Sequence, residues 1–255
     1  MLNKLVFLKM SFWKFFDGIF CINLISRNDR YVSSKKIFQD LRINPTYFRP
    51  KKHPNGGLQG CFESHIHLIK TAYDKGFNNI LIFEDDLYLN SKADLSKYMN
   101  KAIIFMKNNT WDLFYFGPIH DIRFHTTEPT RDPSIFKVHN LCTHAYAINR
   151  PMMEKLKDMK YFGVPIDTLY SFSDKAYSIH PIIFYQGLSA GDIGTGGYYW
   201  FTNYPRLTRM YWDLVQWYAY NINIALLKPN TIFFIIGCII FILLLKFFVS
   251  KYSLK

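Results

Sequence analysis

The chain has 255 residues, of which 49% are hydrophobic and 18% aromatic, and its 31 Lys and Arg against 19 Asp and Glu give a formal charge of +12. This composition excludes a disordered chain and provides for one globular domain, or for one domain with an appendage. The positive charge fits a phosphate-bearing small molecule or an anionic membrane surface. The basic residues form no run longer than the pairs at 35–36 and 51–52, so a nucleic-acid partner is not expected.

The hydrophobic pattern divides most of the chain into alternating strands and helices. Residues 1–17 are apolar but interrupted by lysines, and they lack a cleavage site, so we expect an N-terminal extension rather than a signal peptide. Residues 18–208 are expected to form one α/β domain. Its expected elements are a strand at 18–25, helices at 31–41 and 58–75, a strand at 80–83, a helix at 92–107, a strand at 111–117 and a helix at 151–159.

The carboxyl end is the most apolar part of the sequence. Residues 231–249 contain a single charge, Lys246, which predicts one transmembrane helix. The preceding segment, 209–228, is rich in Trp and Tyr, as membrane-proximal segments are. A helix so close to the end predicts a single-pass, C-terminally anchored protein whose globular domain faces the cytoplasm. The four cysteines form no CxxC pair and are expected to be free thiols, although the sequon at 108–110 leaves a luminal location open.

Consecutive carboxylates follow the apolar strand at 80–83. Glu84, Asp85 and Asp86 stand at its carboxyl end, where open α/β sheets bind ligands. Alternation along an extended chain would place Glu84 and Asp86 on one side and Asp85 on the other. Such acids repel one another unless a cation or hydrogen-bond donors offset their charge. They indicate either a divalent-cation site or a solvated loop with a helix-capping acid.

Two pairs spaced i, i+4 lie in the helix expected at 58–75. Cys61 with His65, and Glu63 with His67, each fit one helical face, as metal ligands often do. The two pairs point in different directions, and zinc would need a third ligand from elsewhere in the chain. Packing and hydrogen bonding are therefore the favoured roles.

The Gly-rich stretch "QGLSAGDIGTGGYYW" has no GKS or GKT and no P-loop spacing. It predicts a flexible loop rather than a nucleotide cradle. Asp192 within it is a candidate polar contact.

A series of sequence blocks, taken in order, resembles glycosyltransferase family 25, which includes lipooligosaccharide and collagen galactosyltransferases. The blocks are "INLISRNDR", "GLQGCFESHIHLIKTAYDKGFNNILIFEDD", "THAYAINRPMMEKL", "VPID" and "QGLSAGDI", over roughly residues 19–193. The resemblance implies a GT-A type fold, with a mixed sheet, in a single catalytic domain. It also implies a nucleotide-sugar donor and a divalent cation, Mn²⁺ or Mg²⁺, held at the acidic motif.

The resemblance also assigns roles to individual residues. Glu84 and Asp86 stand where such enzymes have the outer acids of a DxD motif, and Asp86 is the better candidate for direct metal contact. Asp167 matches the family's Pro-x-Asp position and is the candidate base for the acceptor hydroxyl, with helix capping as its alternative role. The residues implied to bind the nucleotide sugar are Asn23, Arg27, Asp29, Arg30, Gly60, Ser64, His65, Asp85 and Asp192.

The function predicted in this way is metal-dependent transfer of galactose or glucose, with inversion, from a UDP-sugar to a hydroxyl of a glycan, lipid-linked glycan or protein. The alternative is a membrane-anchored, transferase-like protein that binds sugar nucleotide without turnover. This alternative stays open because the sequence departs from the family pattern at two positions. His144 stands where the family often has a small residue, and Gly191 stands where it usually has Ser. A phosphatase of the haloacid-dehalogenase kind is set aside, because residues 85–88 lack its Asp-x-Asp spacing.

Overall fold

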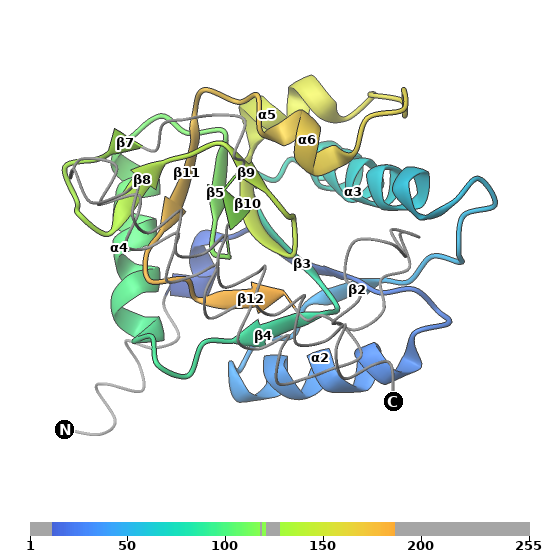
Figure 1. Ribbon diagram of the computed structural model, residues 1–255, viewed down its shortest axis with the longest axis horizontal. Coiled ribbons are helices and arrows are strands. Elements are labelled where there is room, and N and C mark those ends of the chain that lie inside the picture. Colours follow the sequence, from blue (N-terminus) through green and yellow to red (C-terminus); the bar gives the residue numbers. More distant parts are fainter. Residues whose placement is uncertain (1–11, 118, 121–127, 187–255) are drawn as a thin grey trace, which may run out of the picture. The chain divides into compact units, whose positions relative to one another are not determined.

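The computed structural model describes residues 12–117, 119–120 and 128–186, all within the first of two compact units, Met1–Met210 and Tyr211–Lys255 (Figure 1). The described helices are η1 (Phe12–Phe15), α2 (Asn28–Asp40), α3 (Gly57–Asp74), α4 (Leu95–Asn108), α5 (Arg150–Leu156) and α6 (Ile166–Tyr170). The described strands are β1 (Gly18–Ile22), β2 (Thr46–Phe48), β3 (Asn79–Glu84), β4 (Leu87–Leu89), β5 (Leu113–Tyr115), β6 (Ile119–His120), β7 (Glu128–Pro129), β8 (Ile135–Lys137), β9 (Asn140–Leu141), β10 (Ala145–Asn149), β11 (Ala176–Ile179) and β12 (Phe184–Gln186).

The central sheet is mixed, with eight strands in the order β2-β1-β3-β10-β5-β11-β8-β7, which confirms the predicted mixed α/β class. β1 runs parallel to both β2 and β3, and Ile22 lies opposite Glu84. β10 is antiparallel to β3 and β5, and it places Ala145 opposite Phe83. The start of β10 therefore lies beside the carboxyl ends of β1 and β3. Two small sheets pair β4 with β12 and β6 with β9.

Side chains of β3 alternate between two hydrophobic clusters. Leu81 and Phe83 pack with residues of α2 and α4. Ile80 and Ile82 pack on the other face with residues of α3 and α5. Figure 1 shows α2 and α3 on opposite sides of β3. The strand is thus covered on both faces, as its uninterrupted apolar run predicts.

Short polar side chains set the starts of two helices. Asp94 precedes α4, and its carboxylate accepts a hydrogen bond from the Lys97 N–H at 3.0 Å. Asn149 precedes α5 and accepts from the Met152 N–H at 3.0 Å, with Pro151 in the first turn. Each side chain satisfies a backbone donor that the helix itself leaves unpaired.

The amino-terminal part of the structure differs from the predicted elements. β1 ends at Ile22, because the chain then leaves the sheet to form the loop before α2. β2 lies between the helices expected at 31–41 and 58–75, where no strand is predicted. Phe12, Trp13 and Phe16 fall within the expected N-terminal extension, yet their side chains are buried in the core.

Within the part of the chain that the structure describes, no helix is both long and apolar enough to cross a bilayer. The aromatic segment 209–228, the helix expected at 231–249 and the candidate residue Asp192 all lie outside the described residues.

Candidate active site

The acidic residues form a turn at the carboxyl end of the central strands. β3 ends at Glu84, Asp85 and Asp86 form the turn, and β4 begins at Leu87. Glu84 lies on the α3 face of the sheet and Asp85 on the α2 face, as strand alternation requires. Asp86 no longer follows this alternation because the chain turns there, and its carboxylate reaches the same Arg30 as that of Asp85.

The α2 side of the turn is a network of charged and amide groups. Arg30 of α2 donates from one guanidinium nitrogen to Asp85 Oδ1 at 3.1 Å and to Asp86 Oδ2 at 3.4 Å. The Asn23 amide, 1% exposed, donates to Asp85 Oδ2 at 2.6 Å. Arg49 in turn donates to Asn23 Oδ1 at 2.8 Å. The structure therefore brings together the predicted residues Asn23, Arg30, Asp85 and Asp86.

Asp86 is the member of this network whose charge is least compensated. Burial raises its pKa to about 8, the Glu84 charge adds to the increase, and Arg30 opposes it. Among the described residues, no group hydrogen-bonds to Asp86 Oδ1, although that atom is buried. A carboxylate oxygen with its lone pairs unused fits a divalent cation, which would also favour the ionised form.

The α3 side of the turn contacts its carboxylate through a hydroxyl and an imidazole ring instead. The Thr143 hydroxyl donates to Glu84 Oε1 at 2.6 Å, and His65 Nε2 lies 3.4 Å from the same oxygen. His65 Nδ1 is 2.9 Å from the Tyr146 hydroxyl, which lies 3.1 Å from the Tyr170 hydroxyl. Burial alone would raise the pKa of Glu84, but His65 and the Thr143 hydroxyl together hold it below its ordinary value.

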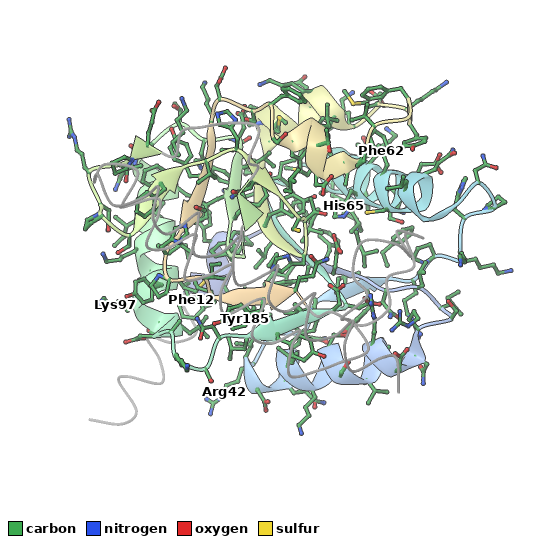
Figure 2. The ribbon with its side chains drawn as sticks, in the orientation of Figure 1. Phe12, Arg42, Phe62, His65, Lys97 and Tyr185 are labelled. Carbon is green, nitrogen blue, oxygen red and sulfur yellow. The ribbon has the colours of Figure 1, made fainter. Side chains whose placement is uncertain are left out.

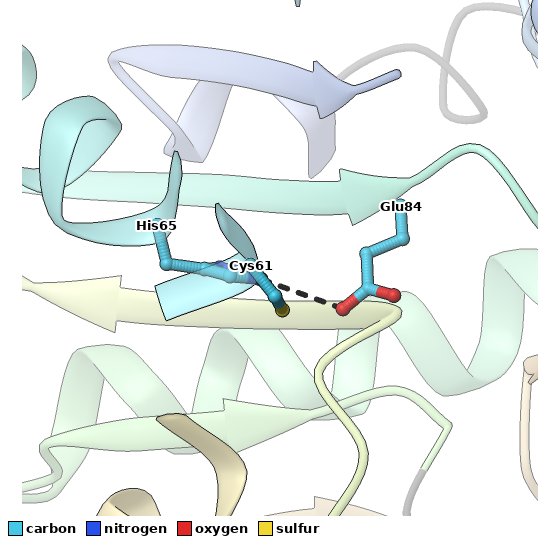
Figure 3. Close-up of side chains that lie close together, drawn as sticks. All are labelled: Cys61, His65 and Glu84. Carbon is cyan, nitrogen blue, oxygen red and sulfur yellow. Dashed lines mark ion pairs between the residues drawn. The ribbon is translucent and has the colours of Figure 1, made fainter. Parts of the chain in front are cut away.

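Cys61 completes a compact group with His65 and Glu84. Cys61 and His65 lie on the same face of α3, and the ligand atoms of all three residues lie within 4.8 Å of one another (Figure 3). The other i, i+4 pair points elsewhere, since Glu63 contacts His53 at 3.3 Å and His67 stacks on a phenylalanine of β2. Glu84 is thus the third potential ligand that sequence spacing alone could not identify.

Arg27 and Asp29 form a separate ion pair at the start of α2. Their side chains lie 2.9 Å apart, and Asp29 is well exposed. The Arg27 hydrogen bonds lower the pKa of Asp29 to about 2. Both residues lie at the same end of the sheet as the acidic turn, because α2 follows β1.

Gly60 and Ser64 have local structural roles in α3. The Ser64 hydroxyl donates to the Gly60 carbonyl at 2.6 Å. A Cβ on Gly60 would lie 2.8 Å from the His53 Cβ, so only glycine lets the preceding loop pack this closely on the helix. Figure 2 shows His65 on the same helix, and its side chain is buried.

Asp167 lies in the first turn of α6 and is half-buried. Its Oδ1 accepts from the Thr168 N–H at 2.6 Å and its Oδ2 from the Cys142 N–H at 3.4 Å. The residue before the helix is Pro165, which makes no side-chain capping bond. Burial is the main cause that raises the pKa of the Cys142 thiol above its ordinary value. The charges of Asp167 and Glu84 raise it further. Asp167 is therefore within electrostatic range of the acidic turn.

The comparison with known sequences decides the family. A sequence profile of glycosyltransferase family 25, described as an LPS biosynthesis protein, matches residues 8–170, more than half of the chain. The chain belongs to glycosyltransferase family 25. This confirms the resemblance carried by the sequence blocks, and this family 25 protein is a glycosyltransferase. A search of curated protein sequences finds no match.

Several solved structures are similar to this glycosyltransferase at low identity. One is a glycosyltransferase involved in the glycosylation of the major capsid of PBCV-1, with 12% identity, 68% of this chain and 96% of that chain covered, and a TM-score of 0.41. Another is a mutant Drosophila β1,4-galactosyltransferase 7 in complex with manganese, UDP-Gal and xylobiose, with 10% identity, 75% and 79% covered, and a TM-score of 0.37. A protein from STIV has 12% identity, 64% and 81% covered, and a TM-score of 0.38.

Two residues near the turn of this family 25 protein were not predicted as site residues. Thr143, which orients Glu84, stands at the start of the quoted block "THAYAINRPMMEKL", but nothing in the sequence shows which carboxylate it meets. His144 Nε2 lies 3.1 Å from the Phe184 carbonyl, and burial lowers its pKa. A Cβ on Gly117 would collide with the His144 ring, so the large histidine is accommodated by a glycine in the bend after β5.

Proposed function

We propose that this glycosyltransferase transfers galactose or glucose from a UDP-sugar to an acceptor hydroxyl, with inversion and with dependence on a divalent cation. The observation that carries the proposal is the buried Asp86 Oδ1, which has no hydrogen-bond partner among the described residues. It lies at the carboxyl end of β3, where open α/β sheets bind ligands. The family supports the transfer of a sugar, and the acidic turn supports the cation.

Asp86 would hold the cation, Mn²⁺ or Mg²⁺, with Glu84 as the neighbouring carboxylate. When bound, such a cation neutralises the negative charge of the departing diphosphate. Arg30 keeps Asp85 and Asp86 in place through its two contacts, so the carboxylates need little rearrangement on donor binding. This assignment of the cation rests on Asp86 Oδ1, which has no hydrogen-bond partner among the described residues, and on the carboxylate oxygens that the turn presents on the α2 side.

Donor recognition would use the residues around the start of α2. The guanidinium fork of Arg27 suits phosphate oxygens, and its present partner Asp29 is exposed enough to be displaced. The first turn of α2 adds backbone N–H groups, which favour an anion at that position. Asn23 orients Asp85, and Asp192 remains a proposed donor contact outside the described residues.

Asp167 is the proposed base for the acceptor hydroxyl. Inversion requires the acceptor to attack opposite the leaving diphosphate and to lose its proton to a nearby side chain. Asp167 is half-buried at the start of α6, and it acts electrostatically on Cys61 together with Glu84 and Asp86. The acceptor would be a glycan, a lipid-linked glycan or a protein. A membrane anchor at 231–249, with the catalytic domain in the cytoplasm, would place the enzyme near such acceptors.

Hydrolysis of a panel of nucleotide sugars, measured with Mn²⁺ and with chelator, tests the proposed reaction. We expect release of UDP from one UDP-sugar that requires the cation. Replacing Asp86 by Asn should lower this turnover at least about a hundredfold, because the uncompensated carboxylate is lost. The exposed acid Asp74 provides the matched control, and Asp74→Asn should retain parental turnover. Cation-dependent turnover that survives Asp86→Asn would exclude the proposed cation site.

Replacing Asp167 by Asn separates a catalytic base from a structural acid. The Asn oxygen can still accept the Thr168 N–H, so folding should be preserved at a cost under about 1 kcal/mol. Turnover onto an acceptor should fall roughly a hundredfold or more, because an amide cannot take the proton. Donor binding should remain, and the exposed Asp174→Asn serves as control. Transfer near the parental rate would leave Asp167 with a structural role only.

A further inference from the structure

The group formed by Cys61, His65 and Glu84 lies on the face of β3 opposite Arg30. The ligand atoms of the three residues lie within 4.8 Å of one another, and His65 Nε2 is 3.4 Å from Glu84 Oε1. Ligands in a tetrahedral zinc site with bonds of 2.0 to 2.3 Å lie about 3.5 Å apart. The histidine–glutamate pair already has this separation, and the Cys61 sulfur lies within 4.8 Å of both ligand atoms.

The three residues are held by regular secondary structure. Cys61 and His65 occupy the same face of α3, one turn apart, and Glu84 is the last residue of β3 (Figure 3). The Thr143 hydroxyl donates a hydrogen bond to Glu84 Oε1 at 2.6 Å and so fixes the orientation of the carboxylate. Because each ligand is oriented by a helix or a strand, binding of an ion requires little ordering of the chain.

The His65 ring presents an unused nitrogen to this group. His65 Nδ1 lies 2.9 Å from the Tyr146 hydroxyl, a partner of the kind that ligating histidines use to fix their tautomer. His65 Nε2 is fully buried and has no hydrogen-bond partner among the described residues, although it lies 3.4 Å from Glu84 Oε1. In the tautomer that carries its proton on Nδ1, this nitrogen offers a lone pair between a thiol and a carboxylate, which is the donor arrangement of a metal ligand.

The composition of the group selects the class of ion. A sulfur, an imidazole nitrogen and a carboxylate oxygen match Zn²⁺, whereas Mg²⁺ and Ca²⁺ take oxygen ligands only. Glu84, Asp167 and Asp86 all place negative charge on the Cys61 thiol, and no described lysine or arginine forms an ion pair with Glu84. A doubly positive ion would balance one thiolate and one carboxylate at this position.

We propose that Cys61 Sγ, His65 Nε2 and Glu84 Oε1 bind one Zn²⁺ ion and leave its fourth position open to water. Binding forms the zinc–sulfur bond and releases the thiol proton of Cys61 to solvent. The ion joins α3 to the end of β3. As a consequence, which does rest on the proposed function, Glu84 is held toward α3 and Asp86 is left as the main carboxylate for the sugar-nucleotide cation.

Cobalt titration of the full-length, metal-free protein tests the site without any sugar nucleotide. Co²⁺ replaces Zn²⁺ in such sites, and a thiolate ligand gives it a charge-transfer absorption that oxygen ligands at Asp86 cannot produce. We expect this absorption at one equivalent, and its loss on addition of Zn²⁺. Cys61→Ser should abolish it, whereas Cys142→Ser, which changes another thiol of the same unit, should retain it.

A second variant keeps the test informative if Cys61→Ser fails to fold. Tyr146→Phe removes only the hydroxyl behind His65, so the thiolate absorption should persist while Zn²⁺ affinity falls at least about tenfold. A parental protein without the absorption, or a Cys61→Ser variant that folds and retains it, would overturn the proposal. Because turnover is not measured, either result is distinct from failure of the glycosyl-transfer proposal.

Discussion

The carboxylates on the two sides of the acidic turn are contacted by different kinds of group. On the α2 side, Asp85 and Asp86 share the guanidinium of Arg30, and all three side chains are about nine-tenths buried. On the α3 side, Glu84 contacts the Thr143 hydroxyl and the His65 ring, and within the described part of the chain no lysine or arginine forms an ion pair with it. Neighbouring acids in the sequence are therefore stabilised by a guanidinium on one face of the sheet and by a hydroxyl and an imidazole ring on the other.

This difference shows which carboxylate is free to change its partner. Burial raises the pKa of Glu84, but the His65 ring and the Thr143 hydroxyl outweigh this effect and lower it, without a lysine or arginine among the described residues that pairs with Glu84. On the α2 side a single guanidinium serves two acids, and Asp86 keeps an unpartnered oxygen among the described residues. A cation that binds the turn therefore has more to offset at Asp86 than at Glu84.

Removal of Arg30 should have the largest effect on stability. Arg30→Met leaves Asp85 and Asp86 buried without their cation, and we expect a loss of about 3–5 kcal/mol in the free energy of unfolding at pH 8. Urea denaturation measures it. Arg27→Met is the matched control on the same segment and should have a much smaller effect, because its partner Asp29 is solvent-exposed. Equal losses in the two variants would contradict a special role for the α2 side.

The pH dependence of stability should show that the ionised form of Asp86 destabilises the folded protein. A folded-state pKa of about 8, above the ordinary 3.8, means that the folded protein binds more protons than the unfolded chain between these values. Asp86 therefore makes stability fall as pH rises through this window. In metal-free protein, Asp86→Asn should be equal to the parent near pH 4 and more stable by several kcal/mol, on the order of 5, near pH 8. Parallel pH profiles from urea denaturation would be the contrary result.

A smaller effect is expected on the α3 side. Thr143→Val removes the hydroxyl that donates to Glu84 at 2.6 Å, and a hydrogen bond to a charged group contributes about 2 kcal/mol. The exposed Thr110→Val controls for the change of side chain. Urea denaturation should show the loss at pH 8, and it should shrink as Glu84 becomes protonated in acid. A loss as large as that of Arg30→Met would erase the distinction between the two sides.

The fold could be predicted where short stretches determine it. The apolar run of β3 and the acids after it indicate a buried strand with a polar end, and the i, i+4 spacing of Cys61 and His65 places both on one face of α3. The sequence did not predict β2, because its three residues lie between prolines in a segment rich in turn-forming residues. Local patterns also could not show that Phe12 and Trp13 pack in the core, since lysines interrupt that segment.

The site could be predicted by residue type but not by partner. The acids and Arg30 were candidates from the sequence, whereas their division between α2 and α3 depends on the turn at Asp85–Asp86 and on the packing of two helices. The third member of the Cys61–His65 group was unknowable for the same reason. Pairing across the sheet is decided by tertiary structure, and no periodicity in one segment encodes it.

The acidic turn obtains its partners from distant parts of the chain, and this has a consequence for folding. Asn23 and Arg30 are 62 and 55 residues from Asp85, and Thr143 is 59 residues from Glu84. Loops of this length must close before any of these contacts forms, so the turn is assembled by the same events that complete the sheet. A peptide with the motif alone would lack the site. A cation that binds the assembled turn and not the unfolded chain therefore stabilises the whole domain in proportion to the logarithm of its concentration.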